Sequence, residues 1–290
     1  MGHSFGRKVV YSASATVLLL LSLEMALAVA GLPSGGIYEG DRYTDWRLKP
    51  NLNREIQHHE EGVSFPVVTS SLGFRDGEIP EDTPWVAAVG CSTTFGWGVR
   101  SELAWPELLE ASLGVDVLNA GVPGHSTHQG KSVAMELIAR KPALLLLGWV
   151  VRDVQLASMA DKDVQAPSGL RATRLFRLIA QSRNAGETSL QGGVHRVGLE
   201  DFRSNLQEII DAAHVANVPV RLLAFPMQNP ANDYLAVLEE LKVPVLSPLL
   251  TAKDFFPADP IHLNAAGNQA LAEALHLPLQ EALRTIGVGG

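Results

Sequence analysis

The sequence has a single cysteine, no cluster of positive charge and no phosphate-binding glycine motif. With Cys91 alone among 290 residues, an internal disulfide and a cysteine-rich zinc site are both excluded. The formal net charge is -8, and Lys and Arg form no basic patch, so nucleic acid is not an expected partner. No glycine-rich stretch has the spacing of a P-loop or of a dinucleotide fingerprint. The sequence therefore argues against a cysteine-rich zinc site, a P-loop or dinucleotide-binding function and nucleic-acid binding.

What the sequence does contain begins with a long apolar run, Val9 to Leu32, which follows two basic residues and includes one charge, Glu24. Its length is close to the ~20 residues that span a bilayer. Basic residues at its start would keep that end in the cytoplasm and place the remainder outside. Residues 28–30, Ala-Val-Ala, also have the small-x-small form of a signal-peptide cleavage site. We expect residues 1–32 to export the protein, either as a transmembrane anchor facing the periplasm or the outside, or as a cleaved signal peptide of a secreted protein.

The remainder divides by composition into two parts. Residues 33–84 are polar and rich in turn formers, which predicts an extended lead-in, with a small hairpin, that packs on the main domain. In residues 85–290, short apolar runs alternate with helix-like segments, a pattern typical of a parallel sheet covered on both faces. The expected strands are Trp85–Gly90, Val115–Ala120, Ala143–Gly148, Pro219–Phe225 and Val243–Leu246. The expected helices are Ala104–Leu113, Gln129–Arg140, Leu170–Ser182, Leu199–Ala216, Asn232–Leu241 and Asn264–Leu275. The fold class is a three-layer α/β/α domain.

The residues that follow the expected strands are candidates for a site, because ligands of open parallel sheets bind outside the carboxyl ends of the strands. Ser92 follows the first strand in Gly-Cys-Ser-Thr-Thr, and Gly121 follows the second in Asn-Ala-Gly-Val-Pro-Gly. Arg152 and Asp153 follow the third strand. Residues 259–262, Asp-Pro-Ile-His, come after the last. One crevice can therefore gather a serine, a glycine turn, an Arg-Asp pair and an Asp/His pair.

These residue types match nucleophilic catalysis by a serine. Ser92 is the candidate nucleophile, since a serine hydroxyl becomes reactive when a base takes its proton and a third group orients that base. His262 can be that base, and Asp259, three positions earlier, can fold back and fix its tautomer. Asn264 is placed to cap the last helix and hold His262 at its start. The backbone N–H groups of Ser92 and Gly121 are the expected oxyanion donors.

Three stretches, VGCSTTFGWGV, LNAGVPGHST and DPIHLNAAGNQALAEAL, resemble in order and spacing the SGNH (GDSL-like) hydrolases, over residues 85 to about 275. The stretch SLGFRDGE and the N-terminal apolar segment also resemble the lead-in of bacterial members. The resemblance implies a flavodoxin-like fold and hydrolysis of esters of lipids, carbohydrates or small acyl compounds. It assigns Ser92 as nucleophile and first oxyanion donor, Gly121 as second donor, and Asp259 and His262 as the rest of the triad.

The sequence departs from the family pattern at two positions. Cys91 stands where the family usually has Asp before the nucleophile. Because side chains alternate along a strand, Cys91 is expected to be a small buried hydrophobe and not a rival nucleophile. Arg152 stands where a family Asn donates the third oxyanion hydrogen bond, while Asp153 is retained. We expect Arg152 to turn aside onto Asp153 or a substrate carboxylate, which leaves the oxyanion hole two backbone donors.

We expect no catalytic role for the remaining polar motifs. Residues 58–61, His-His-Glu-Glu, are expected to be a solvated polar run. His125 and His128 follow the glycine turn and could line the crevice and contact substrate. The loop at 161–169 and the helix expected after it would shape the pocket.

Three functions fit these features. The first is an exported serine esterase of the EC 3.1 class, which cleaves carboxylic esters through an acyl-enzyme without metal or organic cofactor. The second is an O-acyltransferase or deacetylase acting on a cell-envelope polysaccharide. The third is a non-catalytic binding module with the SGNH fold, which the departure at Arg152 leaves open.

Overall fold

The protein is described from a computed structural model. The structure describes residues 2–30, 36–75, 77–164, 173–176, 193–227 and 231–288. The chain forms two compact units, the first made of Met1–Gly36 and Gln165–Gln191 and the second of Ile37–Val164 and Gly192–Gly290. The helix expected at 170–182 lies outside the described residues except for 173–176, and the loop expected at 161–169 is described only as far as residue 164.

The first unit contains the helix α1, Gly2–Val29. Its residues Arg7–Val29 have a mean hydropathy of 1.9, and only 6% of the apolar window is buried. Among the described residues, α1 is the one helix long and apolar enough to cross a membrane. A cleaved signal peptide and a membrane anchor would both have this length and composition. The carboxylate of Glu24 accepts hydrogen bonds from the backbone N–H groups of Arg174, at 2.6 Å, and Leu175, at 3.2 Å.

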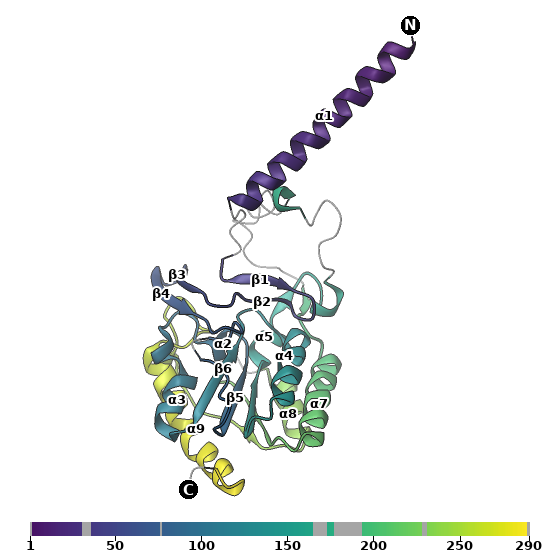
Figure 1. The fold of residues 1–290 in the computed structure, drawn as a ribbon. Helices are drawn as coiled ribbons and strands as arrows, with labels where there is room; N and C mark the ends of the chain where they lie inside the picture. The colour runs from purple at the N-terminus through teal and green to yellow at the C-terminus, as the bar shows by residue number, and fades with distance from the viewer. Residues whose placement is uncertain are drawn as a thin grey trace. The chain divides into compact units, whose positions relative to one another are not determined.

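A five-stranded parallel sheet forms the centre of the second unit, as the sequence predicted (Figure 1). Its strands are β5 (Trp85–Gly90), β6 (Asp116–Gly121), β7 (Leu144–Gly148), β10 (Val220–Leu223) and β11 (Val245–Leu246). The order β11-β10-β7-β5-β6 is, by chain position, the flavodoxin-like order 2-1-3-4-5 read from the other edge. Every residue of β5 and β7 is buried, because helices cover both faces. The strand order changes direction between β5 and β7, which is where such sheets bind ligands.

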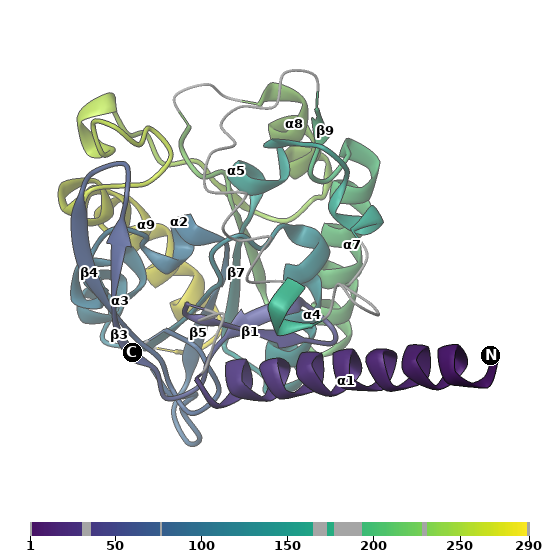
Figure 2. The ribbon, with the colours of Figure 1, turned by 90° about the horizontal axis from the view of Figure 1, so that it is seen from above.

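Helices pack on both faces of this sheet. Figures 1 and 2 show α3 and α9 on one face and α4 and α7 on the other. The helices are α3 (Trp105–Leu113), α4 (Thr127–Ala139), α7 (Leu199–Val215), α8 (Asn232–Glu240) and α9 (Ala265–Thr285), with short turns α2 (Ser92–Phe95) and α5 (Val150–Asp153). The expected end of the last helix at Leu275 is wrong. The helix continues through Pro278 because Leu279 and Leu283 are buried beyond it.

Residues 37–68 form two antiparallel hairpins where the sequence predicted one. They are β1 (Tyr38–Asp41) with β2 (Asp45–Leu48), and β3 (Asn53–His58) with β4 (Val63–Val68). A small apolar cluster joins them to α2 and to the end of β6; its buried members are Ile37, Leu48, Phe65, Val67, Phe95 and Val122. The hairpins therefore pack against the turn that carries Ser92. The remaining short elements are β8 (Leu156–Ala157), paired with β9 (Val194–His195), and the 3-10 turns Ser101–Leu103, Asp161–Asp163 and Ala252–Asp254.

Candidate active site

Ser92 lies at the first position of α2, directly after β5. The tight turn depends on two glycines at the ends of adjacent strands. A Cβ atom on Gly90 would overlap the Thr94 side chain, and one on Gly121 would overlap the backbone of Phe95. Because neither glycine has a Cβ, α2 can sit on the strand ends and present Ser92 at the carboxyl edge of the sheet.

Arg75, in the stretch SLGFRDGE, fixes the other end of α2. Its side chain is fully buried, and its guanidinium donates to the carbonyl oxygens of Phe95, Gly96 (2.7 Å) and Val99 (2.6 Å). The Phe95 and Gly96 carbonyls lie at the end of α2 and have few partners within this short helix, and the Val99 carbonyl lies in the turn that follows. The guanidinium also stacks over the Phe95 ring, with its Cζ 4.2 Å from the ring centroid. This buried arginine therefore holds the segment that follows Ser92.

The hydroxyl of Ser92, His262 and Asp259 form one continuous hydrogen-bonded relay. His262 Nε2 lies 2.7 Å from Ser92 Oγ, and His262 Nδ1 lies 2.5 Å from Asp259 Oδ2. The loop that carries Asp259 and His262 is closed by a bridge between Phe255 and Leu263. Asn264 caps α9 as expected, accepting from the N–H of Gly267 at 3.0 Å. The relay has the nucleophile–base–orienting group arrangement that activates a serine.

Asp259 is held ionised by its surroundings. Burial alone would raise its pKa, but the hydrogen bond and charge of His262 outweigh this, together with bonds from the Ile261 N–H and from His58. The net effect holds the pKa of Asp259 well below its ordinary value of 3.8. An ionised carboxylate only accepts hydrogen bonds, so His262 Nδ1 must carry the proton and Nε2 is left free to accept one from Ser92.

The expectation that residues 58–61 form a solvated run is wrong for His58. Its side chain is 0% exposed, and its Nε2 lies 2.9 Å from Asp259 Oδ2. Sequence reasoning missed it because two adjacent histidines before two glutamates resemble a polar loop. The alternation of β3 offered a signal, since Ile56 and His58 are the more buried residues of a strand whose other side chains are exposed.

The expected backbone donors differ in their availability. The N–H of Ser92 has no acceptor among the described residues. The N–H of Gly121 donates to Asn119 Oδ1 at 3.2 Å, so it would have to share or leave this bond to reach an oxyanion. Gly124, three residues later in the same turn, has φ +91°, and its N–H has no acceptor in the described part of the chain. In this turn, then, the free donor is Gly124 and not Gly121.

Arg152 turns aside, but onto neutral acceptors. Its Nε donates to the carbonyl of Gly124 at 3.1 Å, and its Nη1 donates to Gln155 Oε1 at 2.5 Å. The expected pairing with Asp153 is absent, because that carboxylate accepts from the N–H and hydroxyl of Thr127, at 2.9 and 2.6 Å. Arg152 thus braces the glycine turn.

Asp153 and Cys91 are both buried beside the site. Burial raises the pKa of Asp153 to about 7, against the lowering effect of its bonds to Thr127. Burial likewise raises the pKa of the Cys91 thiol, whose Sγ lies 3.2 Å from Thr93 Oγ1. A buried, protonated thiol is a poor nucleophile. This leaves Ser92 as the nucleophile that the geometry favours.

The two histidines after the glycine turn do not act alike. His125 is buried and its Nε2 lies 2.8 Å from the carbonyl of Trp46, so the expected contact of His125 with substrate is wrong. Burial lowers the pKa of His125 to about 4, so its ring is neutral at pH 7. His128 lines a small cavity of about 40 Å³ beside Lys162 and Asp201.

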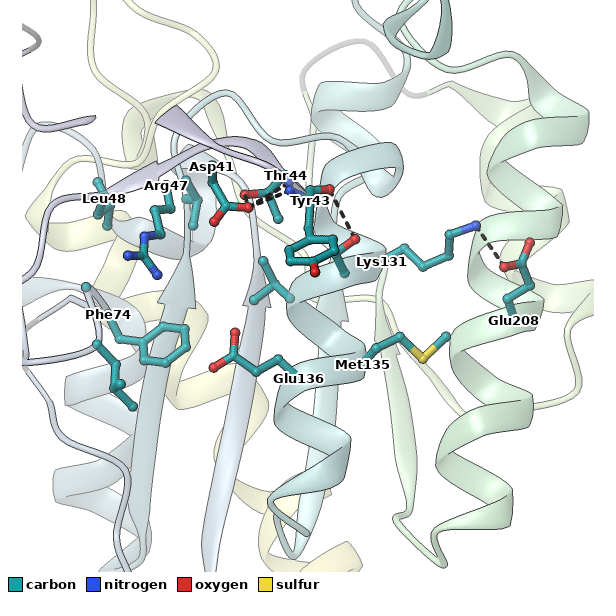
Figure 3. Close-up of a pocket in the computed structure, with 15 residues that line it drawn as sticks. Asp41, Tyr43, Thr44, Arg47, Leu48, Phe74, Lys131, Met135, Glu136 and Glu208 are labelled. Atoms are coloured by element: carbon teal, nitrogen blue, oxygen red, sulfur yellow. Dashed lines mark hydrogen bonds and ion pairs between the residues drawn. The ribbon is translucent and has the colours of Figure 1, made fainter. Parts of the chain in front are cut away.

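Two cavities bear on ligand binding. One of about 270 Å³ borders the relay, since Pro260 and Ile261 line it together with Val151, Val154, Gln155, Pro226 and Met227. A larger one, of about 670 Å³, lies between the β1–β2 hairpin and α4 (Figure 3). Charged side chains line the larger one, including the Lys131–Glu208 pair at 2.8 Å. Neither cavity is lined by Ser92, Asp259 or His262, but the smaller, mostly apolar one is lined by the two residues that lie between Asp259 and His262 in the chain. The smaller cavity is therefore the better candidate for a substrate of Ser92.

Among the described residues, His58, Asp259 and His262 are a group whose possible metal-ligand atoms lie within 4.8 Å of one another. Hydrogen bonds through Asp259 already account for their proximity.

Comparison with known proteins finds similarity to solved structures. No family model and no curated protein matches the chain. A G-D-S-L family protein from Desulfitobacterium hafniense is 17% identical, with a TM-score of 0.47 over 69% of this chain and 99% of that one. The psychrotrophic esterase EstA from Pseudoalteromonas is 12% identical, with a TM-score of 0.48 over 69% and 98%. A GDSL-like lipase from Bacteroides thetaiotaomicron is 14% identical, with a TM-score of 0.45 over 71% and 93%. Two of these three structures are named as G-D-S-L or GDSL-like proteins, the family that the three stretches in the sequence resemble. The chemistry of this chain rests on its own side-chain geometry.

Proposed function

We propose that the protein is an ester hydrolase in which Ser92 is the nucleophile, His262 the general base and Asp259 the group that orients His262. The observation that carries the proposal is the relay itself, in which contacts of 2.7 and 2.5 Å connect Ser92 Oγ to the Asp259 carboxylate through His262. A relay assembled from residues 170 positions apart favours an enzyme over a binding module.

The reaction proceeds in two steps. His262 Nε2 takes the Ser92 proton as Oγ attacks the ester carbonyl, and the protonated ring then gives that proton to the leaving alcohol. A water then attacks the acyl-enzyme while His262 takes its proton, and the protonated ring returns that proton to Ser92 Oγ as the carboxylic acid is released. The free N–H groups of Ser92 and Gly124 are the proposed oxyanion donors, with the Gly121 N–H as a further donor if it releases Asn119.

The apolar cavity beside Pro260 and Ile261 supports a substrate with a small apolar acyl group. Transfer of the acyl group to a sugar hydroxyl of a cell-envelope polysaccharide, in place of water, uses the same relay and is the second candidate. The helix α1 supports export of the protein, with α1 kept as a membrane anchor or removed as a signal peptide.

A panel of p-nitrophenyl esters of increasing acyl length tests the proposal, with the full chain in a mild detergent and its Ser92→Ala variant as control. We expect hydrolysis by the wild type, a preference for short acyl groups and no hydrolysis above background by the variant. Equal rates for the two proteins would contradict the proposal. Product formation on an added sugar acceptor, at the expense of hydrolysis, would favour acyl transfer.

A further inference from the structure

We propose that His58 is a positioning residue of the active site, which holds the Asp259 carboxylate and, through it, the His262 ring. The inference rests on the proposed function, since it assigns His58 a part in the relay of Ser92. It extends the site to the β3–β4 hairpin, which lies outside the sheet and precedes every other relay residue in the chain.

The hairpin delivers His58 to the site from a distant part of the sequence. His58 is the last residue of β3, pairs with Val63, and lies 201 positions before Asp259. Its side chain is completely buried, whereas the next residue, His59, is exposed. The two neighbouring histidines therefore differ in environment, and His59 is a matched control for His58.

One oxygen of Asp259 serves both histidines. Oδ2 accepts from His262 at 2.5 Å and from His58 at 2.9 Å, and the two rings stand nearly perpendicular, at 88°. The other oxygen, Oδ1, accepts from the N–H groups of Ile261, at 3.0 Å, and His262, at 3.4 Å. His58 is thus the side chain that ties the carboxylate to an element outside its own loop.

The hydrogen bond also fixes the form of the His58 ring. Because the ionised carboxylate only accepts, Nε2 carries the proton. Nδ1 is buried and has no hydrogen-bond partner in the described part of the chain; it lies beside Gly98 and the Phe256 ring, whose centroid is 4.8 Å from that of His58. A second proton would bury an N–H with no acceptor, which is costly. The charged groups that face this ring are Asp259 and the largely exposed Glu60, whose Oε2 lies 3.6 Å from Nε2.

A neutral donor suits this position. It orients Asp259 without cancelling its negative charge, which the relay needs when His262 becomes protonated. Without His58, the carboxylate would be held by its own loop alone and could rotate away from His262. Loss of the His58 hydrogen bond should therefore lower kcat, which reports the chemical step, and should change KM little.

The test compares His58→Gln with His58→Met in the full chain. The two replacement side chains have similar size, and the Gln amide nitrogen reaches the position of His Nε2. They differ because Gln can donate a hydrogen bond to Asp259 and Met cannot. We expect His58→Met to lower kcat by about ten- to a hundredfold with KM within threefold, since a hydrogen bond to a charged group is lost. His58→Gln should restore most of kcat, and His59→Met should leave it unchanged. The downfield proton NMR signal of His262 Nδ1–H should move in His58→Met and stay in place in His58→Gln.

The outcomes separate the two claims. A His58→Met protein with wild-type kcat, or a His58→Gln protein as slow as His58→Met with the NMR signal unmoved, would overturn the role of His58 and leave the proposed function intact. If the Met variant does not fold, His58→Gln compared with His58→Asn decides, because the Asn amide is too short to reach Asp259. A wild-type protein with neither turnover nor a reactive Ser92 would instead refute the proposed function.

Discussion

His262 Nε2 lies 2.7 Å from Ser92 Oγ, within hydrogen-bond distance, although the two residues are 170 positions apart in the sequence. The His262 side chain is 15% exposed, so substrate can reach the pair while the Asp259 side chain, 9% exposed, remains behind it. This order, from solvent to buried carboxylate, is what a serine nucleophile with a base and an orienting group requires.

Removing the base should abolish turnover. We expect His262→Ala to lower kcat by about 10⁶-fold, as losing either the nucleophile or the base costs nearly as much as losing both. Asp259→Asn should be milder, about 10⁴-fold, because the ring remains but its tautomer is no longer fixed. Steady-state kinetics on a p-nitrophenyl ester, with circular dichroism as the folding control, checks both. A His262→Ala enzyme within tenfold of wild type would refute the assignment of the base.

Arg152 can be tested as an oxyanion donor with two replacements. Since its guanidinium is bonded to Gly124 and Gln155, we expect it to give the transition state little help. Arg152→Asn should raise kcat on neutral esters by supplying a short donor, with KM nearly unchanged. Arg152→Leu loses the same bonds and supplies no donor, so it should be about 10²-fold slower than the Asn variant. A tenfold fall in kcat in Arg152→Asn would contradict this expectation and show that Arg152 supports catalysis, either as a donor or through its bond to the Gly124 carbonyl.

The buried carboxyl group of Asp153 should make the free energy of unfolding depend on pH. Its pKa is raised from 3.8 to about 7 in the folded protein, so the folded state holds a proton that the unfolded state loses. The stabilisation of the folded state by this proton is fully present below about pH 4 and is lost as the pH rises to about 7. Asp153→Asn removes it, so the Tm of the variant relative to wild type should increase from pH 5 to pH 7.5. Thermal melts at constant ionic strength check this, and an equal difference at both pH values would contradict it. His125, whose pKa is lowered to about 4, contributes with the opposite sign in both proteins and cancels in the difference.

Gly98 offers a test of the packing around His58. A Cβ atom at Gly98 would lie 2.7 Å from His58 Nδ1 and 2.6 Å from Phe256 Cε2. Gly114 has a similar positive φ, 66° against 91°, but open space around its Cβ position. Both replacements by Ala carry the backbone cost of about 1 kcal/mol. Only Gly98→Ala should also lower kcat, and equal kcat values for the two variants would contradict the tight packing.

The location can be tested with fusions. A reporter that is active only outside the cytoplasm, fused after residue 290, should be active, because the basic residues before the apolar run keep the N-terminus inside. Deletion of residues 1–31 should leave the rest of the protein soluble and in the cytoplasm. Activity of a cytoplasmic reporter on the full-length fusion would contradict export.

The sheet could be predicted from the sequence because its strands are short, apolar and separated by amphipathic helices. Strand β5 begins and ends where expected, β6 begins and ends one residue later, and β7 begins one residue later and ends as expected. The C-terminal helix extends beyond its expected end at Leu275, because the burial of Leu279 and Leu283, a tertiary effect, outweighs the usual helix-breaking influence of Pro278.

The relay residues followed from local signals, namely a serine after a strand and Asp-x-x-His before a helix. His58 could not be found in this way, because its contact with Asp259 depends on how a separate hairpin folds over the site. The partners of Arg152 and the engaged N–H of Gly121 were missed for the same reason. Side chains choose among nearby acceptors in three dimensions, and the sequence shows only which groups are present.

Labelling by a fluorophosphonate tests the central claim most directly, since the probe forms a covalent bond with an activated serine and peptide mass spectrometry identifies the residue. We expect one labelled site, Ser92, with labelling lost in Ser92→Ala and strongly slowed in His262→Ala. Labelling of another residue, or none in a folded wild-type protein, would contradict it.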